Sequence, residues 1–264
     1  MSAAAAAGGR LTRTLYRALL REARALKQPL RLVDQPTLEQ AVRNYGRAAF
    51  STPPPAPALQ RAHFPGVDFS QLPGAVRFTG AEVAALVRAG FRAAAAPAPA
   101  GGGGGGGDAQ QHLSALNTLR ALAPCHSAAV SEAGAGVRVE VELATLALPT
   151  LPLHLLVASE RFTFAYRVRV ANTGTAPVQI LARHWQFFNA HGELLEVPRG
   201  SPGVVGHSPR IEPGKCFEYY SGVSLSTPTG TMEGSFQMVG HDGRVSFDGV
   251  AARAELRGPA APGS

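Results

Sequence analysis

The spacing of apolar residues changes near residue 136, and this change divides the chain into two parts. Before it, apolar side chains recur every three or four residues, as they do on one face of an amphipathic helix. After it, apolar and polar residues alternate, as they do in a strand with one buried face. The sequence therefore predicts a helical first part and a β-rich second part.

Helical spacing covers four segments of the first part. The first segment ends before Pro29, and the others span 37–49, 80–96 and 110–122. Ala-Pro repeats and seven consecutive glycines at 101–107 separate the third segment from the fourth. Such a composition is typical of a flexible linker without a packed core.

Strict alternation predicts a series of short strands in the second part. These strands cover 137–143, 162–170, 178–188, 216–224, 234–239 and 245–250. The Asp242-Gly243 pair between the last two is a strong hairpin signal. Short strands with one polar face and regular turns predict an antiparallel β-sandwich or barrel, and a two-sheet sandwich fits best.

These patterns give a domain organisation with four segments. They are a helical region at 1–96, a flexible Gly/Ala/Pro linker at 97–109, a short helix and connector at 110–134, and a β-sandwich at 135–257. We therefore expect a mainly β protein whose sandwich is preceded by a small helical region.

Adjacent aromatic residues occur in two of the predicted strands, as Phe187-Phe188 and Tyr219-Tyr220. Neighbouring strand residues face opposite sides, so one member of each pair must leave the main core. The pattern predicts a second apolar surface, which is either covered by the helical part or used by a partner.

The positive charge is concentrated near the N-terminus. Residues 1–50 contain nine basic and three acidic groups, whereas the other 214 residues contain sixteen and fifteen. A nearly neutral β-rich part argues against a nucleic-acid partner. No stretch of about 18 apolar residues occurs, so we expect no transmembrane segment.

The first 28 residues form an amphipathic segment with no acid before Glu22. One helical face carries the arginines at 10, 13, 17, 21 and 24. Three interpretations stay open: an organelle transit peptide, the first helix of a small helical domain, or a surface helix without a targeting role. We expect a mitochondrial protein, with plastid or cytoplasmic and nuclear locations as alternatives.

A glycine-rich segment between two predicted strands is the candidate anion-binding site. Its glycines let backbone amides point into a concavity, and its basic side chains add positive charge, as a phosphate or pyrophosphate requires. The candidate residues are Arg199, Gly200, Gly203, Gly206, His207 and Arg210. A tight turn between two strands would need the same glycines for steric reasons alone.

No motif in the sequence indicates catalysis, a metal site or a cofactor. Only two cysteines, Cys125 and Cys216, occur, so a disulfide framework or a complete zinc site is excluded and a reducing compartment is the default. The histidines of the second part lack metal-ligand spacing, and His184 is expected to be a hydrogen-bonded strand residue. We expect a protein that is not an enzyme.

Residues 162–256 resemble the ApaG domain in the order and spacing of several motifs. The matching segments are 164–172, 178–185, 203–206, 213–214, 217–222, 227–230 and 232–238. The resemblance implies a fibronectin-III-like β-sandwich that recognises partners without catalysis. It also implies a pyrophosphate-binding loop of pattern Gly-x-Gly-x-x-Gly, from which Ser201 and Pro202 depart.

The run Leu15-Tyr16-Arg17, with Arg21, resembles the start of LYR-motif proteins, which are small helical bundles that help assemble mitochondrial complexes and iron–sulfur clusters. The resemblance implies binding to acyl carrier protein, whose acidic surface meets basic residues. Phe91 matches the later phenylalanine of this family, although at a long distance, and Tyr45 lies at a better distance but is a tyrosine. The implied partner-binding residues are Leu15, Tyr16, Arg17, Arg21 and Phe91.

The sequence thus predicts an adaptor without enzymatic activity. Its helical segment docks an acidic protein, either acyl carrier protein or an organelle assembly factor, through Arg13, Arg17, Arg21 and Arg24. The flexible linker joins this segment to an ApaG-like sandwich that recognises a second partner. The alternative is a module that binds phosphate, pyrophosphate or a metal-bound anion through residues 199–210.

Overall fold

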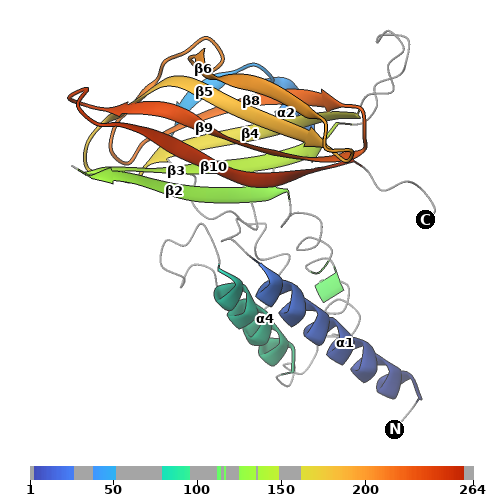
Figure 1. Ribbon diagram of the computed structural model, residues 1–264. Coiled ribbons are helices and arrows are strands. Elements are labelled where there is room, and N and C mark those ends of the chain that lie inside the picture. The colour runs from blue at the N-terminus through green and yellow to red at the C-terminus, as the bar shows by residue number, and fades with distance from the viewer. Residues whose placement is uncertain are drawn as a thin grey trace. The chain divides into compact units, whose positions relative to one another are not determined.

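The structure is a computed structural model, and its described residues fall into two compact units. It describes residues 3–26, 38–51, 79–95, 112–113, 116, 125–134, 136–148 and 162–258. A helical unit lies within residues 1–34 and 55–123, and a sandwich unit lies within residues 35–54 and 124–264. Figure 1 shows the elements of both units.

Helices α1 (Ala3–Ala25) and α4 (Gly80–Ala95) form most of the described part of the helical unit. Their apolar residues, spaced three or four apart, meet in a small core: Leu15, Leu19, Ala23, Val83, Ala84, Leu86 and Val87, with Leu116. Helix α4 starts with a capping box, because the backbone N–H of Thr79 donates to Glu82 Oε2 at 2.7 Å and the N–H of Glu82 donates to Thr79 Oγ1 at 3.3 Å. The predicted helix at 80–96 is thereby confirmed.

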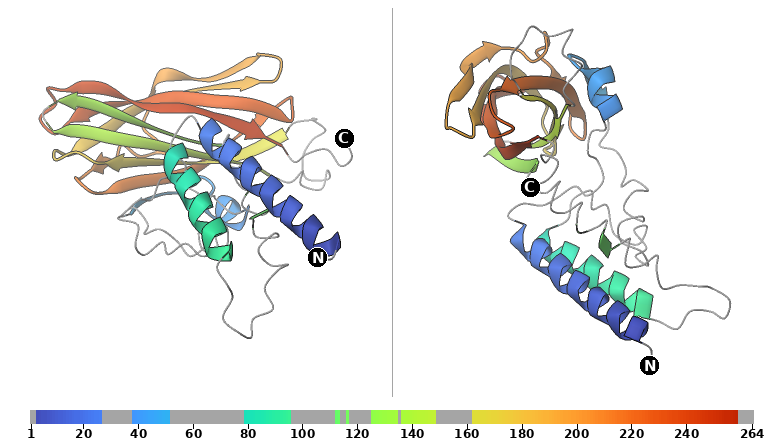
Figure 2. Two further views of the ribbon diagram at one scale, coloured as in Figure 1. Left: turned by 90° about the horizontal axis from the view of Figure 1, so that it is seen from below. Right: turned by 90° about the vertical axis from the view of Figure 1, so that its right-hand side faces the viewer.

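The sandwich unit contains two antiparallel sheets, and a short helix α2 (Leu38–Asn44) precedes its first strand. The first sheet has the order β1 (Ala48–Ser51), β8 (Cys216–Leu225), β4 (Phe162–Asn172), β3 (Val137–Ala147) and β2 (His126–Gly134). The second has the order β10 (Ser246–Arg257), β9 (Thr229–Gly240), β5 (Val178–Asn189) and β6 (Leu194–Pro202), with β7 (Arg210–Ile211) also paired to β5. Figure 2 shows the strands from two further directions.

Alternation along the strands places one face of each sheet in a common core. On β4 the inward residues are Phe164, Tyr166, Val168 and Val170, and all are buried. They pack against Trp185, Phe236 and other buried residues of the second sheet. The predicted antiparallel sandwich is therefore confirmed.

Two strands lie where helix or connector was expected. Strand β2 occupies 126–134, inside the segment 110–134 that was expected to be a short helix and connector, and it pairs with β3. Its small residues Ala128 and Ala129 give little contrast between apolar and polar positions, so the alternation in the sequence did not predict this strand. The described residues 112, 113 and 116 are helical, and the expected linker at 97–109 lies outside the described residues.

The predicted helix 37–49 is also corrected. Helix α2 ends at Asn44 before a turn, and β1 then pairs with β8, with Ala48 opposite Tyr219. Residues 35–54 of the predicted helical region 1–96 thus belong to the sandwich unit. The alanine-rich run Arg47-Ala-Ala-Phe50 suits a helix by local propensity, but pairing with β8 overrides that propensity.

One side of the sandwich is closed by hydrogen bonds between the two sheets. Ser127 Oγ of β2 donates to the carbonyl oxygen of Ala252 of β10 at 2.6 Å, and Ser131 Oγ accepts from the backbone N–H of Val250 at 2.9 Å. Thr145 Oγ1 of β3 donates to the carbonyl oxygen of Glu255 at 2.6 Å. At the opposite side, where β6 and β8 lie, the sheets separate around a cavity.

The outer face of the first sheet carries a buried cluster of charges. Arg167 of β4 is 1% exposed, and its Nη2 lies 3.1 Å from Oε1 of the equally buried Glu142 of β3. Arg169 pairs with Glu218 of β8, and Nε2 of the buried His126 lies 3.3 Å from Glu142 Oε1. Buried charges are stable only when they are paired. The cluster therefore favours the one alignment of β2, β3, β4 and β8 in which these side chains meet.

Candidate functional site

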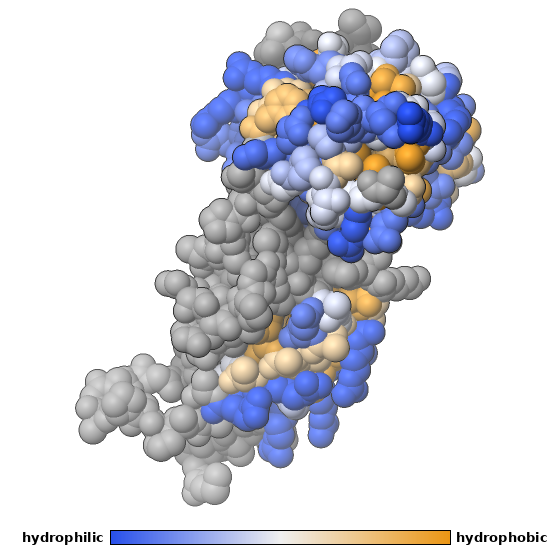
Figure 3. Space-filling view, turned by 90° about the vertical axis from the view of Figure 1, so that its left-hand side faces the viewer, coloured by the Kyte–Doolittle hydropathy of each residue, from blue (hydrophilic) through white to orange (hydrophobic). Residues whose placement is uncertain are grey.

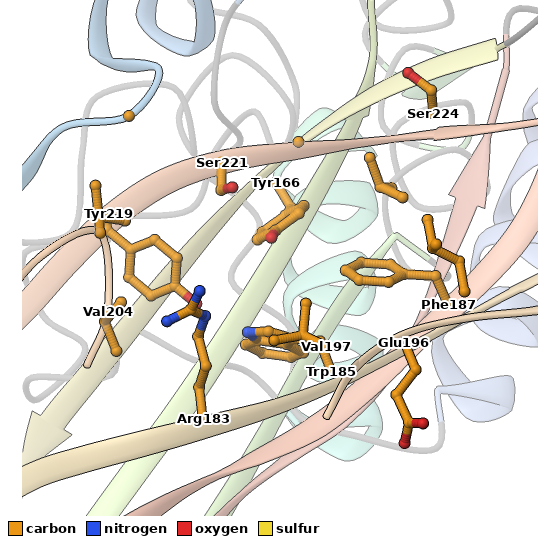
Figure 4. Close-up of a pocket in the computed structure, with 15 residues that line it drawn as sticks. Tyr166, Arg183, Trp185, Phe187, Glu196, Val197, Val204, Tyr219, Ser221 and Ser224 are labelled. Atoms are coloured by element: carbon orange, nitrogen blue, oxygen red, sulfur yellow. The ribbon is translucent and has the colours of Figure 1, made fainter. Parts of the chain in front are cut away.

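The open side of the sandwich contains a cavity of about 530 Å³ (Figure 4). Strands of both sheets contribute to its wall. The residues that line it are Gly46, Tyr166, Arg183, Trp185, Phe187, Leu195, Glu196, Val197, Val204, Val205, Tyr219, Ser221, Gly222, Val223 and Ser224. A volume of this size is typical of pockets that hold small molecules.

Aromatic side chains form the rigid inner wall of this cavity. The ring centroid of Tyr166 lies 6.1 Å from that of Trp185 and 5.9 Å from that of Phe187. Trp185 in turn meets Phe236 edge to face at 5.5 Å. Rings at these separations stabilise one another and hold their positions, so the pocket is preformed.

A small polar cluster lies among these rings. Nη1 of Arg183 donates to the carbonyl oxygens of Pro202 at 3.0 Å and of Gly203 at 2.6 Å, which fixes the guanidinium. In Figure 4 this guanidinium and the Tyr219 hydroxyl point toward one another, and Nε1 of Trp185 faces them. The carboxylate of Glu196 points away and lies 2.8 Å from His184 Nε2.

Two polar atoms of this cluster are buried and make no hydrogen bond of standard geometry. Trp185 is 1% exposed and Tyr219 is 2% exposed. By hydrogen-bond geometry, neither the indole Nε1 nor the Tyr219 hydroxyl has a partner within the part of the chain that the structure describes, and the indole lies close enough to the hydroxyl to lower the pKa of Tyr219. Buried donors are almost always satisfied, because an unpaired one costs about 1–3 kcal/mol. Such a pair in a preformed pocket indicates a place for a ligand acceptor.

Both tyrosines of the pocket keep their protons at neutral pH. Burial raises the pKa of the Tyr219 hydroxyl well above its usual value of 10.0, and the neighbouring Tyr166 raises it further, while Trp185 and Arg183 partly offset this rise. Burial likewise raises the pKa of Tyr166, with a smaller opposing effect from Ser221. A protonated Tyr219 can donate a hydrogen bond to a ligand.

Exposed apolar side chains surround the entrance of the cavity. We call Tyr45, which lies against the lining residue Gly222, and the lining residue Leu195 the apolar rim; they are 54% and 51% exposed. A Cβ at Gly222 would lie 2.8 Å from Cε2 of Tyr45, so only glycine at this lining position leaves room for the Tyr45 ring. Phe50 contacts Phe217 at a centroid distance of 5.4 Å.

The arginines of the predicted anion site at 199–210 already have carboxylate partners. Arg199 lies in β6 and not in a loop, and its Nη1 and Nη2 donate to the two carboxylate oxygens of Asp248 at 2.5 and 2.8 Å. Arg210 lies in β7, and its Nε donates to Glu212 Oε1 at 3.0 Å. Each positive charge is therefore paired with a different carboxylate.

Backbone amides of the same segment also donate within the protein. The N–H of Gly200 donates to Gln237 Oε1 at 3.2 Å, and that of Gly203 donates to the carbonyl oxygen of Leu181 at 2.8 Å. The N–H of His207 donates to the carbonyl oxygen of Val204 at 2.9 Å. Gly206 has a φ of 77°, as a tight turn requires. The segment forms the wall beside the cavity, where its carbonyls hold Arg183.

Sequence reasoning missed the polar cluster, although a signal for it exists. Arg183, Trp185 and Phe187 share the inner face of β5 after an irregularity between Ile180 and Ala182 that changes which residues face inward. Arg183 stands two residues before Trp185 and four before Phe187, so this charged side chain interrupts an otherwise apolar strand face. A charged residue at such a position indicates a functional site.

The aromatic pairs expected to give a second apolar surface point to opposite faces, as predicted. Phe187 and Tyr219 line the cavity, whereas Phe188 is half-buried with the Arg253 guanidinium 5.9 Å from its ring centroid. Tyr220 is buried and forms a bridge with Tyr45.

The helical unit brings together two of the residues implied as partner-binding. The Tyr16 and Phe91 ring centroids are 5.0 Å apart, and Phe91 stacks on His112 at 3.8 Å. Leu15 is 6% exposed and belongs to the core between α1 and α4, so it packs inside the unit. Arg17 and Arg21 are exposed, as are Arg13 and Arg24.

The histidine and the two cysteines that the sequence singled out have structural roles. His184 is the hydrogen-bonded strand residue that was expected, with Glu196 as its partner. Cys125 and Cys216 are buried and form no disulfide, and burial raises the pKa of the Cys125 thiol. In the described ranges, no group of three His, Cys, Asp or Glu side chains is arranged to hold a metal ion, and no helix has the length and hydropathy to span a membrane.

Comparison with known proteins finds a family match within residues 124–264, the range of the sandwich unit. A family model described as the ApaG domain matches residues 155–240. "Protein ApaG" of Thiobacillus denitrificans is 40% identical over 123 residues, which are 47% of this chain and 91% of the relative. "Protein ApaG" of Pseudomonas entomophila is 46% identical over 103 residues, 39% of this chain and 79% of the relative. A crystal structure of a Bordetella pertussis protein, described as a putative ApaA protein, is 32% identical and covers 52% of this chain and 97% of its own, with a TM-score of 0.41.

Proposed function

The chain belongs to the ApaG family, and from this premise we propose that it is an adaptor whose sandwich unit binds a partner protein at its open side. The observation that carries this proposal is the cavity with two buried donors, Trp185 Nε1 and the Tyr219 hydroxyl, that make no hydrogen bond of standard geometry. A partner that inserts a side chain or chain end into the cavity satisfies both donors. No catalytic step is part of the proposal.

The apolar rim supports a protein partner over a small solute alone. Tyr45 comes from residues 35–54, Leu195 comes from β6, and both are more than half exposed. Protein interfaces are typically built from aromatic and aliphatic side chains around a deeper anchor pocket. A partner segment that crosses the rim buries these side chains while its anchor enters the cavity.

The helical unit supplies a second docking surface in this proposal. Figure 3 shows a row of polar side chains beside an apolar band on the described part of that unit. The exposed arginines 13, 17, 21 and 24 give α1 a basic face, which attracts an acidic protein. By its likeness to LYR-motif proteins, we assign this face to acyl carrier protein or to an assembly factor in mitochondria.

Site-specific photo-crosslinking tests the role of the sandwich unit. A benzophenone amino acid replaces Leu195 at the rim in one variant and Val250, which is 46% exposed on β10 at the closed side, in the control. We expect the variant at 195 to crosslink a partner that the variant at 250 does not. Equal crosslinking at both positions would contradict the proposal.

A further inference from the structure

We infer that the cavity on the open side of the sandwich binds a carboxylate carried on an apolar group. The inference rests on the proposed function, because it names the chemistry that the sandwich recognises there. It follows from which atoms face the cavity, from their charge, and from the apolar character of the remaining wall.

The polar groups of the cluster around Arg183 are hydrogen-bond donors, whereas the lining hydroxyls of Tyr166, Ser221 and Ser224 can donate or accept. The indole Nε1 of Trp185 and the guanidinium of Arg183 can only donate, and Tyr219 keeps its proton and can donate as well. The described residue Glu196 is the single carboxylate of the lining, and it points away toward His184. The cluster around Arg183 therefore favours a ligand that brings acceptor atoms, and an anion brings the strongest ones.

Charge balance favours a monoanion over a phosphate. Arg183 is the single cation among the described lining residues, and its Nη1 is already committed to the carbonyls of Pro202 and Gly203. A phosphate monoester carries a charge of about −1.5 to −2 at neutral pH, so part of that charge would be buried without a partner. A carboxylate carries one negative charge, which one guanidinium balances.

The rest of the wall requires an apolar body on the ligand. Tyr166, Phe187, Val197 and Val223 surround the polar cluster, and Leu195 stands at the entrance. A carboxylate on an aromatic or aliphatic stem places its head at Arg183 and its stem against these side chains. Burying that stem removes apolar surface from water and so strengthens binding.

Two sources can supply this chemistry: the C-terminal residue of a partner chain, when its side chain is apolar, and a free organic acid. Both present the same head and stem to the cavity. They differ in what continues beyond the entrance, where a partner chain would run across the apolar rim.

The intrinsic fluorescence of the full chain reports binding directly, because Trp185 is the single tryptophan of the sequence and lines the cavity. Phenylacetate is the first probe, and phenylacetamide and phenyl phosphate are its neutral and more highly charged analogues. We expect saturable quenching or a spectral shift with phenylacetate, and binding at least tenfold weaker with either analogue. No saturable change with phenylacetate, or equal binding of phenylacetamide, would overturn the inference, and equal or tighter binding of phenyl phosphate would do the same.

Two tyrosines that neighbour each other on β8 give a matched pair of variants. Y219F removes only the hydroxyl that faces Arg183, whereas Y220F makes the same change on the opposite face of the strand, away from the lining. We expect Y219F to bind phenylacetate about tenfold more weakly or worse and Y220F to bind it as the wild type does. Near-ultraviolet circular dichroism checks that both variants are folded. Equal binding by two folded variants would overturn the inference.

A leucine-terminated tripeptide, as free acid and as C-terminal amide, distinguishes the two sources. Tighter binding of the tripeptide acid than of phenylacetate assigns the pocket to a chain end, and the reverse order assigns it to a free organic acid. Failure of all carboxylates, with crosslinking still specific to position 195, would overturn only the carboxylate chemistry. Specific carboxylate binding with equal crosslinking at 195 and 250 would overturn the protein-partner role alone.

Discussion

Arg183 Nη1 on β5 donates to the carbonyl oxygen of Gly203 at 2.6 Å, and this contact ties the glycine-rich segment to the cavity. Gly203 has a φ of 62°, and a Cβ there would lie 2.6 Å from the carbonyl oxygen of His207. The glycine is thus required by the turn that aims its carbonyl at Arg183. We interpret this segment as a support that positions the guanidinium.

Replacing Gly203 by alanine is expected to destabilise the sandwich unit by about 2–3 kcal/mol, because a strained φ and a backbone clash act together. The control is Gly192→Ala, where φ is 81° but nothing lies within 4 Å of the added Cβ. That control is expected to cost about 1 kcal/mol, from backbone strain alone. Urea unfolding of both variants measures the difference, and an equal loss would contradict this role of Gly203.

The buried charge cluster predicts that Glu142 contributes far more to the free energy of unfolding than the exposed Glu132. Glu142→Gln removes the charge that faces Arg167 in the buried outer layer of the first sheet, and we expect a loss of about 3 kcal/mol in the free energy of unfolding. Glu132→Gln makes the same change at an exposed pair with Arg138, where the side chains are 64% and 49% exposed. We expect less than about 1 kcal/mol there. Chemical denaturation measures both, and similar losses would argue that the buried cluster contributes little.

The tyrosines of the cavity predict a loss of stability at alkaline pH. The pKa of Tyr219 is raised in the folded protein above its usual value of 10.0, so the unfolded chain releases this proton first as the pH rises. The protonated Tyr219 hydroxyl therefore contributes to the free energy of unfolding. This contribution is fully present below about pH 10 and is lost as the pH rises through the higher pKa of the folded state.

We therefore expect Y219F to show a shallower decline of the melting temperature above pH 10 than the wild-type chain. Thermal unfolding at a series of pH values, at constant ionic strength, measures this slope. If Y219F and the wild-type chain declined in parallel, the hydroxyl of Tyr219 would not be the buried group that we describe.

The basic face of α1 predicts salt-dependent binding to an acidic protein. We expect the variant R13A/R17A/R21A/R24A to bind acyl carrier protein at least tenfold more weakly than the wild type and with a weaker dependence on salt. The control R210A/R244A/R253A/R257A removes the same charge from the sandwich unit. Titration at two ionic strengths measures both, and equal weakening by the two variants would show that only net charge matters.

The sequence predicts the sandwich well because its long strands carry the period of two without interruption. Phe162 to Val170 alternate strictly, and the structure places them in the centre of the first sheet. Strand β1 was missed because Ala48 and Ala49 have helical propensity, and only pairing with β8, about 170 residues later in the chain, makes them extended. Local patterns do not contain that long-range contact.

The candidate site was only partly predictable, for a related reason. The glycine-rich segment stood out as a local motif, but its partner Arg183 belongs to a different strand, and only the folded register brings them together. An irregularity at Leu181 changes which β5 residues face inward, and the sequence gives no sign of it. The apolar rim likewise combines Tyr45 and Leu195, which are far apart in the chain.

The most direct test of the account follows the indole N–H resonance of Trp185, which is the one indole signal of the full chain in a nitrogen–proton correlation spectrum. The partner crosslinked at position 195 is titrated into the chain labelled with nitrogen-15. We predict that this resonance shifts in proportion to the fraction of chain bound, because the partner fills the cavity beside Trp185. Saturable binding that leaves the resonance unmoved would place recognition elsewhere on the protein and contradict binding of the partner in the cavity.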